Sequence, residues 1–251
     1  MKLSTTKDSN KPSIIAVIPF RQGSKGLIDK NIMPVKGIPL FRYSTEFAQR
    51  LGLPAVVSTD YDESKIRSHL RDERFVARPA ELASDSSVMG DVIEHIIDHR
   101  DFESFTHILL LQPTSPLRSV KVYEKLYRAY TANGGSGIAL TVRAASSQIL
   151  KIGVIEDNKL INVANKNDFF FQNRQELPKV YAPDGNMYLF SVSEFKRKSM
   201  FPSDIIVPVV NDDDFTIDID SQSDVIQLNT YLHNKPISEE YKWIESLSFL
   251  H

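Results

Sequence analysis

The sequence predicts an α/β protein in which helices cover both faces of a mainly parallel sheet. Short apolar runs of strand length, such as Ile14–Ile18 and His107–Gln112, alternate along the chain with segments of helical period. This alternation is typical of parallel strands joined by crossover helices. Ligands of such sheets bind beyond the carboxyl ends of the strands, so chemistry is expected in the segments Pro19–Asn31, Ser58–Asp62 and Gln112–Arg118.

The composition is that of a folded domain without a strong charge bias. Of the 251 residues 41% are apolar, and 30 Lys and Arg stand against 32 Asp and Glu, a net charge of −2. This balance gives no reason to expect a nucleic acid or a membrane surface as a partner. The chain has no cysteine, which excludes disulfides, thiolate metal ligands and cysteine nucleophiles. We expect a cytoplasmic protein with a flexible tail at 1–12 and a single domain at 13–251, since no signal peptide or membrane span is recognised.

The predicted elements alternate from the first strand onwards. Ile14–Ile18 is a β-branched run that Pro19 ends, and Pro39–Leu51 is a helix with a proline in its first turn. Further strands are expected at 55–59, 107–112, 138–142, 186–190, 205–210 and 215–219, and further helices at 62–70, 88–99 and 119–133. The last predicted helix runs to His233 from Ser221-Gln-Ser-Asp224, which resembles a capping box.

The alternation fails between residues 143 and 183. This segment is polar and contains Phe169-Phe170-Phe171. Three adjacent phenylalanines cannot all face one core, because neighbouring side chains of a helix or strand point in different directions. Two interpretations stay open: the segment folds irregularly onto its own sheet, or a partner subunit covers some of its apolar side chains.

The first predicted strand leads into a loop rich in glycine and cations. Gly23 and Gly26 permit backbone conformations that turn N–H groups towards an anion. Arg21, Lys25 and Lys30 supply charge that can neutralise a triphosphate. The spacing matches neither a P-loop nor the Gly-x-Gly-x-x-Gly dinucleotide fingerprint. An anion-binding loop is favoured over a solvated basic loop.

Asp218 and Asp220 form a second candidate site near the last predicted strand. Two residues apart in a strand, their side chains share a face about 6.6 Å apart, where two carboxylates repel by about 2.5 kcal/mol at an effective dielectric constant of about 20. A cation is expected to offset this repulsion, and carboxylates completed by water and phosphate oxygens suit Mg²⁺. The alternative is a solvated acidic strand end beside Asp212-Asp213-Asp214.

A further pattern, His95-Ile-Ile-Asp98-His99, resembles a zinc-hydrolase helix because two histidines share one face. An aspartate stands where that motif has a glutamate, and an apolar stripe assigns the helix to core packing. Metal binding is therefore not favoured there.

Several blocks occur in the order found in the cytidylyltransferases that make CMP-activated acidic sugars. The blocks are Arg21-x-Gly23-Ser24-Lys25-Gly26-x-x-x-Lys30-Asn31, Ser58-Thr59-Asp60, Arg78-Pro79-x-x-Leu82-Ala83-Ser84-Asp85, Leu111-Gln112-Pro113-Thr114-Ser115-Pro116-Leu117-Arg118, Arg174-Gln-Glu-Leu-Pro178 with Tyr181, and Asp218-Ile-Asp220. Over roughly Ile14–Val225 the chain therefore resembles the CMP-sialic acid synthetase family.

This resemblance implies a Rossmann-like, three-layer nucleotidyltransferase fold and a homodimer. It implies CTP and an acidic sugar as substrates, Mg²⁺ as cofactor and pyrophosphate as a product. It also implies that 143–183 is a dimerisation arm that reaches into the neighbouring subunit's active site. The phenylalanines of this segment would then be covered by the partner.

The resemblance also assigns roles to individual residues. The nucleotide would contact Arg21, Gly23, Ser24, Lys25, Asn31, Arg78, Ala80, Leu82 and Ser84. The acceptor would contact Gln112, Thr114, Ser115, Lys151, Arg174 and Tyr188. Catalysis would use Arg21, Lys25, Lys30, Asp218 and Asp220, with the last two as metal ligands. Alternatives stay open for single residues: Thr114 or Ser115 could cap the following helix, and Tyr188 could be a core tyrosine.

The chain departs from the family pattern in two places. Phe20 and Gln22 stand where the family usually has alanine and glycine. Ala182-Pro183-Asp184-Gly185 replaces a basic residue followed by Pro-Asn-Gly. The loss of a cation and the gain of an acid near the acceptor pocket would disfavour a sugar carboxylate held in the same way.

The expected reaction is cytidylyl transfer from CTP to a keto-acid sugar such as a sialic acid or a related nonulosonic acid. The residues do not decide whether Asp218, Asp220 or a metal-bound hydroxide takes the proton from the sugar hydroxyl. The alternatives are a Kdo-like or unusual acidic acceptor, or a non-catalytic nucleotide-binding homologue. The joint presence of both basic and acidic groups argues against the last of these.

Overall fold

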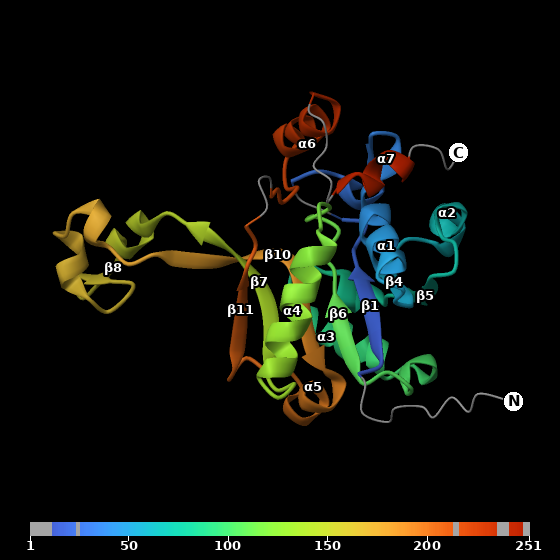
Figure 1. The fold of residues 1–251 in the computed structure, drawn as a ribbon, viewed down its shortest axis with the longest axis horizontal. Coiled ribbons are helices and arrows are strands. Elements are labelled where there is room, and N and C mark those ends of the chain that lie inside the picture. Colours follow the sequence, from blue (N-terminus) through green and yellow to red (C-terminus); the bar gives the residue numbers. More distant parts are fainter. Residues whose placement is uncertain (1–11, 24–25, 213–215, 235–240, 248–251) are drawn as a thin grey trace, which may run out of the picture.

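The structure, a computed structural model, describes residues 12–23, 26–212, 216–234 and 241–247. Its centre is a seven-stranded sheet in the order β11-β7-β10-β6-β1-β4-β5, shown in Figure 1. The strands are β1 (Ile14–Pro19), β4 (Ala55–Thr59), β5 (Arg74–Ala77), β6 (His107–Leu110), β7 (Ile138–Ala145), β10 (Val180–Ser191) and β11 (Ile206–Val210). β10 runs antiparallel to β6 and β7, and the other neighbouring strands are parallel.

Two apolar clusters, one on each face of the sheet, confirm the three-layer prediction. The helices are α1 (Leu40–Arg50), α2 (Glu63–Ile66), α3 (Met89–Ile97), α4 (Val120–Ala132), α5 (Val192–Lys198), α6 (Gln222–Asn234) and α7 (Trp243–Leu247). Residues of α1, α4, α6 and α7 pack with Ala16 and Ile18 of β1. Residues of α3 and α5 pack with Ile15 and Val17 on the opposite face, as the alternation of side chains along a strand requires.

The order of the strands reverses beside β1. The chain passes from β1 to β4 and β5 on one side and then crosses to β6 on the other side of β1. A reversal of this kind leaves a crevice between the loops that follow the two central strands. Those loops begin at Phe20 after β1 and at Leu111 after β6.

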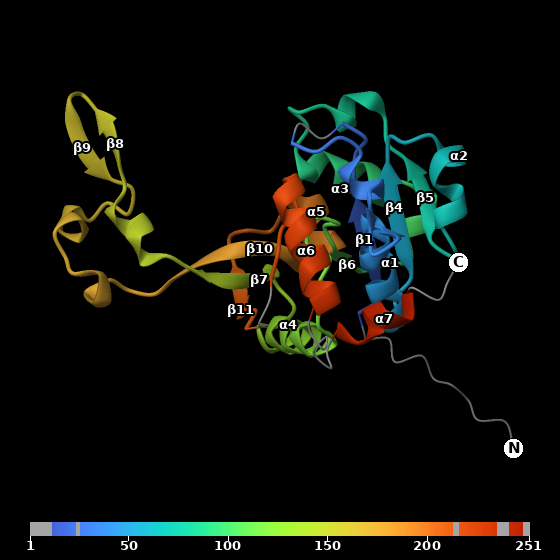
Figure 2. The ribbon, with the colours of Figure 1, turned by 90° about the horizontal axis from the view of Figure 1, so that it is seen from above.

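The segment 143–183 forms an arm that extends away from the sheet in both views (Figures 1 and 2). β7 and β10 pair as far as Ala145 and Val180. Beyond them lie a hairpin of β8 (Gly153–Glu156) and β9 (Lys159–Asn162) and short 3-10 helices at Ser147–Lys151, Asn167–Phe170 and Arg174–Glu176. The arm does not fold back onto its own sheet, so the first of the two interpretations is wrong. We keep the name arm for 143–183.

Most predicted elements occur, with three notable errors. The predicted helix 62–70 divides into α2 and a 3-10 turn at Arg67–His69. The described part of the predicted strand 215–219 forms no strand; it crosses the carboxyl edge of the sheet, where the Ile219 N–H donates to the Thr114 carbonyl. β5 was missed because only Val76 of its four residues is buried, which leaves no periodic signal.

Smaller elements were missed for a similar reason. β2 (Pro34–Val35) and β3 (Ile38–Pro39) form a two-residue ladder, and α5 has a single buried side chain, Phe195. The expected flexible tail lies, except for Pro12, outside the described residues. In the described part of the chain, each helix is too short or too polar to cross a bilayer.

Candidate active site

A cleft of about 330 Å³ opens at the carboxyl edge of the sheet, where the strand order reverses. Residues that directly follow β1, β5 and β6 form its walls, as expected for a doubly wound sheet. Eight residues singled out from the sequence line it: Arg21, Lys30, Asn31, Arg78, Leu82, Ser84, Gln112 and Thr114. Its volume lies in the range of small-ligand sites. This is the candidate active site.

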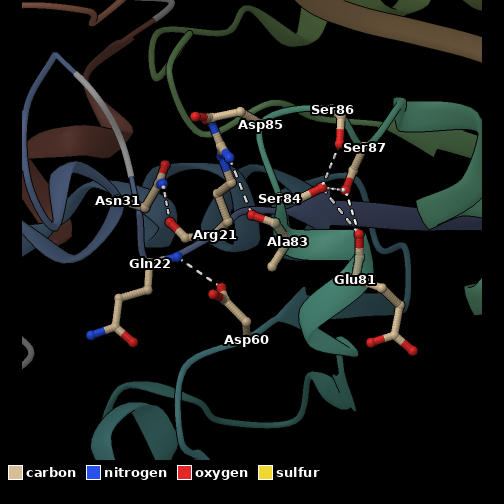
Figure 3. A network of polar contacts seen from close by, with 10 residues as sticks. All are labelled: Arg21, Gln22, Asn31, Asp60, Glu81, Ala83, Ser84, Asp85, Ser86 and Ser87. Atoms are coloured by element: carbon tan, nitrogen blue, oxygen red, sulfur yellow. Dashed lines mark hydrogen bonds and ion pairs between the residues drawn. The ribbon is translucent and has the colours of Figure 1, made fainter.

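We call residues 20–31, which follow β1, the basic loop. Its start is held by two neighbouring segments (Figure 3). Arg21 donates to the Ala83 carbonyl at 3.1 Å and to the Asp85 carboxylate at 2.6 Å. The Gln22 N–H donates to Asp60 at 2.7 Å. Gln22, which departs from the family pattern, thus contributes its backbone N–H. The loop is fixed at its entry before any ligand binds.

Asn31 supports the same loop from its other end. Its side-chain amide is buried and donates to the Arg21 carbonyl at 3.2 Å (Figure 3). Gly23 is exposed, and the space that a Cβ would need there is open. The other two predicted contacts of this loop, Ser24 and Lys25, lie outside the described residues.

The loop opposite Arg21 is ordered by its own serines (Figure 3). It begins with a 3-10 helix at Ala80–Ala83. The Ser84 and Ser87 hydroxyls both donate to the Glu81 carbonyl, at 3.2 Å and 2.8 Å. Leu82 and Ser84 line the cleft, whereas Ala80 is exposed and is not among the lining residues.

Arg78 enters the cleft from the end of β5 with an unsatisfied donor. The residue is 8% exposed, and its guanidinium donates to the Ser58 carbonyl at 2.9 Å. Its Nε and the Ser58 hydroxyl are buried without a hydrogen-bond partner among the described residues. Burial lowers the pKa of Arg78 to about 10, while Asp60 raises it and Arg21 lowers it further. A buried donor without a partner in the wall of a cleft is suited to a polar ligand atom.

We call residues 218–220 the acidic segment. It meets the basic loop through Lys30. This lysine is 9% exposed, and its ammonium group donates to the Ile219 carbonyl at 2.7 Å and to the Asp220 carboxylate at 2.9 Å. The loop also passes close to this segment at Gly26, where a Cβ would lie 2.7 Å from the Asp220 carbonyl oxygen. A cation that lines the cleft is therefore bonded to an acid 190 residues away in sequence, although neither Asp218 nor Asp220 is itself among the lining residues.

Asp218 and Asp220 are not arranged as a strand predicts, because the backbone here is not paired. Asp218 lies on the side of Tyr188. Burial raises the pKa of this tyrosine, and the charges of Asp184 and Asp218 raise it further. Asp220 faces Lys30. Both carboxylates are exposed. No group of three or more potential metal ligands occurs among the described His, Asp and Glu residues, so these two acids would have to share a cation with ligand oxygens.

The predicted acceptor residues divide between the cleft and its support. Gln112 and Thr114 line the cleft. Ser115 is buried and donates to the Asp184 carbonyl at 3.2 Å. The capping alternative for Thr114 and Ser115 is wrong, because Ser119 caps α4 by accepting from the Val122 N–H. Tyr188 is half-buried on β10 and pairs with Leu110 of β6.

Two further predicted acceptor contacts lie in the arm. Lys151 ends one 3-10 helix and Arg174 begins another. Neither lines the cleft of its own chain, and the arm extends away from the sheet in Figure 2. They could reach an acceptor only in another subunit.

The roles of Asp60, Asp85, Arg118 and Asp184 are not predictable from the sequence pattern. Asp60 and Asp85 stood in quoted blocks, but their partners come from other loops. Asp184 was expected to add charge beside the acceptor. Instead, its carboxylate is buried and accepts from Thr141, Asn186 and Asn211. The residue lies where β10 bulges, and its carboxylate is held by these donors and is not among the residues that line the cleft.

The zinc-hydrolase pattern gains no support from the geometry. His99 lies beside Asp101, and Asp98 pairs with Lys196 of α5. The Nδ1 of His95 is buried without a partner among the described residues. As stated above, the described residues hold no cluster of three or more metal-ligating side chains.

Comparison with protein families identifies the fold and its lineage. The family model described as cytidylyltransferase matches residues 15–237. The chain belongs to the cytidylyltransferase family. The match spans the cleft, the arm and the acidic segment alike.

Curated relatives of this cytidylyltransferase fall into two length classes. The chain is 28% identical over 224 residues to the N-acylneuraminate cytidylyltransferase of Escherichia coli, covering 85% of this chain and 51% of that protein. It is 30% identical over 224 residues to the CMP-N,N'-diacetyllegionaminic acid synthase of Campylobacter jejuni, covering 84% of this chain and 91% of that protein. The chain thus spans about half the length of the first relative and nearly all of the second.

Solved structures share the fold at low sequence identity. The structure of CMP:2-keto-3-deoxy-manno-octonic acid synthetase complexed with CTP superposes with a TM-score of 0.63 and 14% identity, covering 88% of this chain and 98% of that one. The 4-diphosphocytidyl-2C-methyl-D-erythritol synthase of Anaerococcus prevotii gives 0.57 and 16%, covering 88% and 96%. These likenesses support the Rossmann-like nucleotidyltransferase fold alone.

Proposed function

We propose that this cytidylyltransferase transfers CMP from CTP to an acidic keto-sugar of the nonulosonic acid class. The observation that carries the proposal is the cleft itself, where Lys30 joins the basic loop to the acidic segment opposite Arg78 and Gln112. Relatives named for sialic and legionaminic acid activation support the acceptor class.

The nucleotide is proposed to bind between the basic loop and the loop at residues 78–87. The unsatisfied Nε of Arg78 and the backbone around Leu82 and Ser84 would recognise the cytosine. Arg21 would turn towards the β- and γ-phosphates, since, among the described residues, Ala83 and Asp85 accept from two of its five N–H donors. Lys25, of the same loop, is assigned the same task by the family resemblance.

Asp218 and Asp220 are proposed to hold Mg²⁺. Two exposed carboxylates are hard oxygen donors and leave most of an octahedral coordination sphere to water and phosphate oxygens, so the residues fit the ion. When bound, the ion would screen the phosphate charge and help to orient the reacting groups. Lys30 would keep Asp220 in place from the buried side.

The reaction forms a bond between the anomeric oxygen of the sugar and the α-phosphorus of CTP. The bond from the α-phosphorus to the bridging oxygen of pyrophosphate breaks in line, and pyrophosphate leaves with that electron pair. Arg21 and Lys30 would stabilise the charge that develops on the leaving group, and Gln112 and Thr114 would orient the sugar. The hydroxyl proton would pass to Asp218 or Asp220, in the segment that is bonded to the cleft residue Lys30.

The arm is proposed to complete the acceptor site of a second copy of the chain. Large apolar side chains stay exposed along it, namely Ile149, Ile152, Val154, Ile155, Leu160, Val163, Phe171 and Tyr181. An apolar surface of this kind is expected to be covered in an assembly. Lys151 and Arg174 of one subunit would then approach the cleft of the other. We also propose a cytoplasmic location, where CTP is available.

Thermal shift with nucleotides and pyrophosphate release with acceptors test this function together. CTP with Mg²⁺ is expected to raise the melting temperature more than ATP, GTP or UTP. Pyrophosphate release is then measured with N-acetylneuraminic acid, N,N'-diacetyllegionaminic acid and 2-keto-3-deoxy-manno-octonic acid. Release with one of the first two supports the proposal, and release with the third alone moves the acceptor to the shorter keto-acids. Stabilisation by CTP without release on any acid would favour a non-catalytic nucleotide-binding protein.

A further inference from the structure

β10 bulges where it passes the rim of the cleft. Pro183 pairs with Val142 of β7 and Tyr188 with Leu140, so five residue steps along β10 face two along β7. Gly185 lies within the bulge with a φ of +74°, a conformation that residues with a side chain rarely adopt. We call Asp184–Met187 the β10 bulge. Bulges beside ligand sites redirect side chains that a regular strand would place elsewhere.

The β10 bulge encloses a buried carboxylate. Asp184 Oδ1 accepts from the Thr141 hydroxyl at 2.5 Å and from the Asn186 N–H at 3.0 Å, and Oδ2 accepts from the Asn211 side chain at 2.9 Å. All three partners are donors. The carboxylate is therefore fully engaged inside the protein, and it is not among the residues that line the cleft.

A buried cation lies on the other side of the same bulge. Arg118 has no solvent exposure, and its guanidinium donates to the carbonyls of Asn186 and Gln112 at 3.0 Å and 2.6 Å and to the Ser44 hydroxyl at 3.0 Å. Burial lowers its pKa to about 9, and Asp184 is the charge that opposes this decrease. The hydrogen-bond acceptors of Arg118 are neutral oxygens, and Asp184 supplies the negative charge that compensates the guanidinium.

The bulge contacts the loop 112–118, which carries the proposed acceptor residues, at several points. Ser115 donates to the Asp184 carbonyl at 3.2 Å, and the Asn186 side chain donates to the Leu117 carbonyl at 2.7 Å. At Gly185 a Cβ would lie 3.1 Å from Oε1 of Gln112. The amide that faces the cleft therefore rests directly on the bulge.

We propose that Asp184 and Arg118 are positioning residues, which hold the β10 bulge against the loop 112–118 and so fix the Gln112 amide for the acceptor. Two buried opposite charges are costly to desolvate, and an apolar pair would fill the same space more cheaply. What the charges supply is a specific set of hydrogen bonds: three donors meet the Asp184 carboxylate, and three oxygens accept from the Arg118 guanidinium. The assignment of the acceptor as ligand rests on the proposed function.

The test is Asp184→Asn, which keeps the shape and removes the charge. An asparagine offers one oxygen to three donors and places its own NH₂ among them, so the bulge and the loop are expected to loosen. Hydrogen–deuterium exchange should rise in peptides covering 112–118 and 184–187. The acceptor KM should rise by about tenfold, while the CTP KM changes by less than about twofold.

The matched control is Glu194→Gln at the opposite edge of the sheet. Glu194 is also a partly buried carboxylate, and it accepts from the Ser136 hydroxyl and the Gly137 N–H, both at 2.8 Å. The control is expected to lower the melting temperature without changing exchange at 112–118 or the acceptor KM. The double variant Asp184→Asn with Asn211→Asp returns a carboxylate opposite the new amide and should recover part of the exchange protection.

If Asp184→Asn does not fold, Thr141→Val decides, because it removes the hydrogen bonds of the Thr141 hydroxyl with Asp184 and with the Met187 backbone and leaves both charges in place. Increased exchange at 112–118 in that variant supports the proposal. Unchanged exchange at 112–118 in a folded variant overturns it, as does an equal loss of CTP and acceptor affinity. If the wild-type protein turns over no acceptor while the variants show the expected exchange changes, the proposed function is refuted and the positioning role stands.

Discussion

The cleft and the arm leave opposite kinds of side chain exposed. In the cleft, charged groups are held by partners from the same chain, as Lys30 is by Asp220 and Arg21 by Asp85. In the arm, apolar side chains meet solvent, with Ile155 77% and Phe171 88% exposed. The difference leads us to predict that the proposed nucleotide half of the site needs one chain alone, whereas the proposed role of the arm needs a second copy. Nucleotide binding and acceptor use should therefore respond separately to mutation.

Removal of the acid that pairs with Lys30 should have the largest effect. Asp220→Asn is expected to lower kcat by about 100-fold or more, because the charge that faces Lys30 and the proposed Mg²⁺ is lost. Steady-state pyrophosphate release measures the loss, and circular dichroism and size-exclusion chromatography check the fold and assembly.

The control for this variant is Asp212→Asn. Asp212 is exposed and forms an ion pair with Lys125 at 2.8 Å, outside the cleft. Its loss should leave kcat unchanged. Near-normal turnover of Asp220→Asn would contradict the assignment of the acidic segment to catalysis.

A charge placed in the arm should separate the two halves of the site. Ile155→Asp is expected to weaken self-association by at least about tenfold, since a carboxylate cannot be buried cheaply in an apolar interface. Light scattering across a dilution series measures this change. Acceptor turnover should fall with dimer content, whereas stabilisation by CTP should persist.

The matched control is Ile226→Asp on α6, which replaces an isoleucine that is also exposed but lies outside the arm. It should change neither association nor turnover. If the arm variant stays dimeric and fully active, the apolar surface of the arm has no role in assembly.

A milder change inside the cleft sharpens the nucleotide half of the comparison. Asp85→Asn keeps an oxygen for Arg21 but removes the charge, and both side chains are partly exposed. Exposed ion pairs contribute little, so the CTP KM should rise by about threefold with kcat unchanged. Asp204→Asn, which alters an exposed pair with Lys198, serves as the control. A large loss of kcat would mean that Asp85 has a more direct role.

The smallest effect is a pH dependence that belongs to neither region. Burial holds the pKa of His107 below its usual value, and Glu194 acts in the opposite direction. Below pH 6.5 the unfolded chain therefore binds more protons than the folded chain, and the free energy of unfolding falls as the pH falls. His107→Phe should flatten this slope in denaturant titrations at pH 5–7 and leave CTP binding unchanged. An unaltered slope would show that His107 is not the responsible group.

The sequence predicted the layers of the fold because those elements are apolar and periodic. β1 and β4 are buried throughout, and their runs were recognisable without any alignment. The segment around Asp218 carried no such signal, since its path is set by hydrogen bonds to Thr114 and Lys30 from distant parts of the chain. The family blocks placed residues at the cleft, but not their partners.

The arm and the β10 bulge show the same limit. The polar segment 143–183 hides a hairpin, because a ribbon of two exposed strands has no buried face to impose a period. Asp184 was expected to add an acid near the acceptor pocket, and the sequence does not show the bulge in which its carboxylate bonds to Thr141. Pairings across the fold, rather than local pattern, decide these positions.

Product identification by mass spectrometry and ³¹P NMR tests the account most directly. The protein is incubated with CTP, Mg²⁺ and either N-acetylneuraminic or N,N'-diacetyllegionaminic acid. The account predicts one new phosphodiester, the CMP-sugar, in equal amount to pyrophosphate, and no product when CTP is replaced by UTP. Pyrophosphate accompanied by free CMP alone, or CTP that stays intact with every acid, would contradict it.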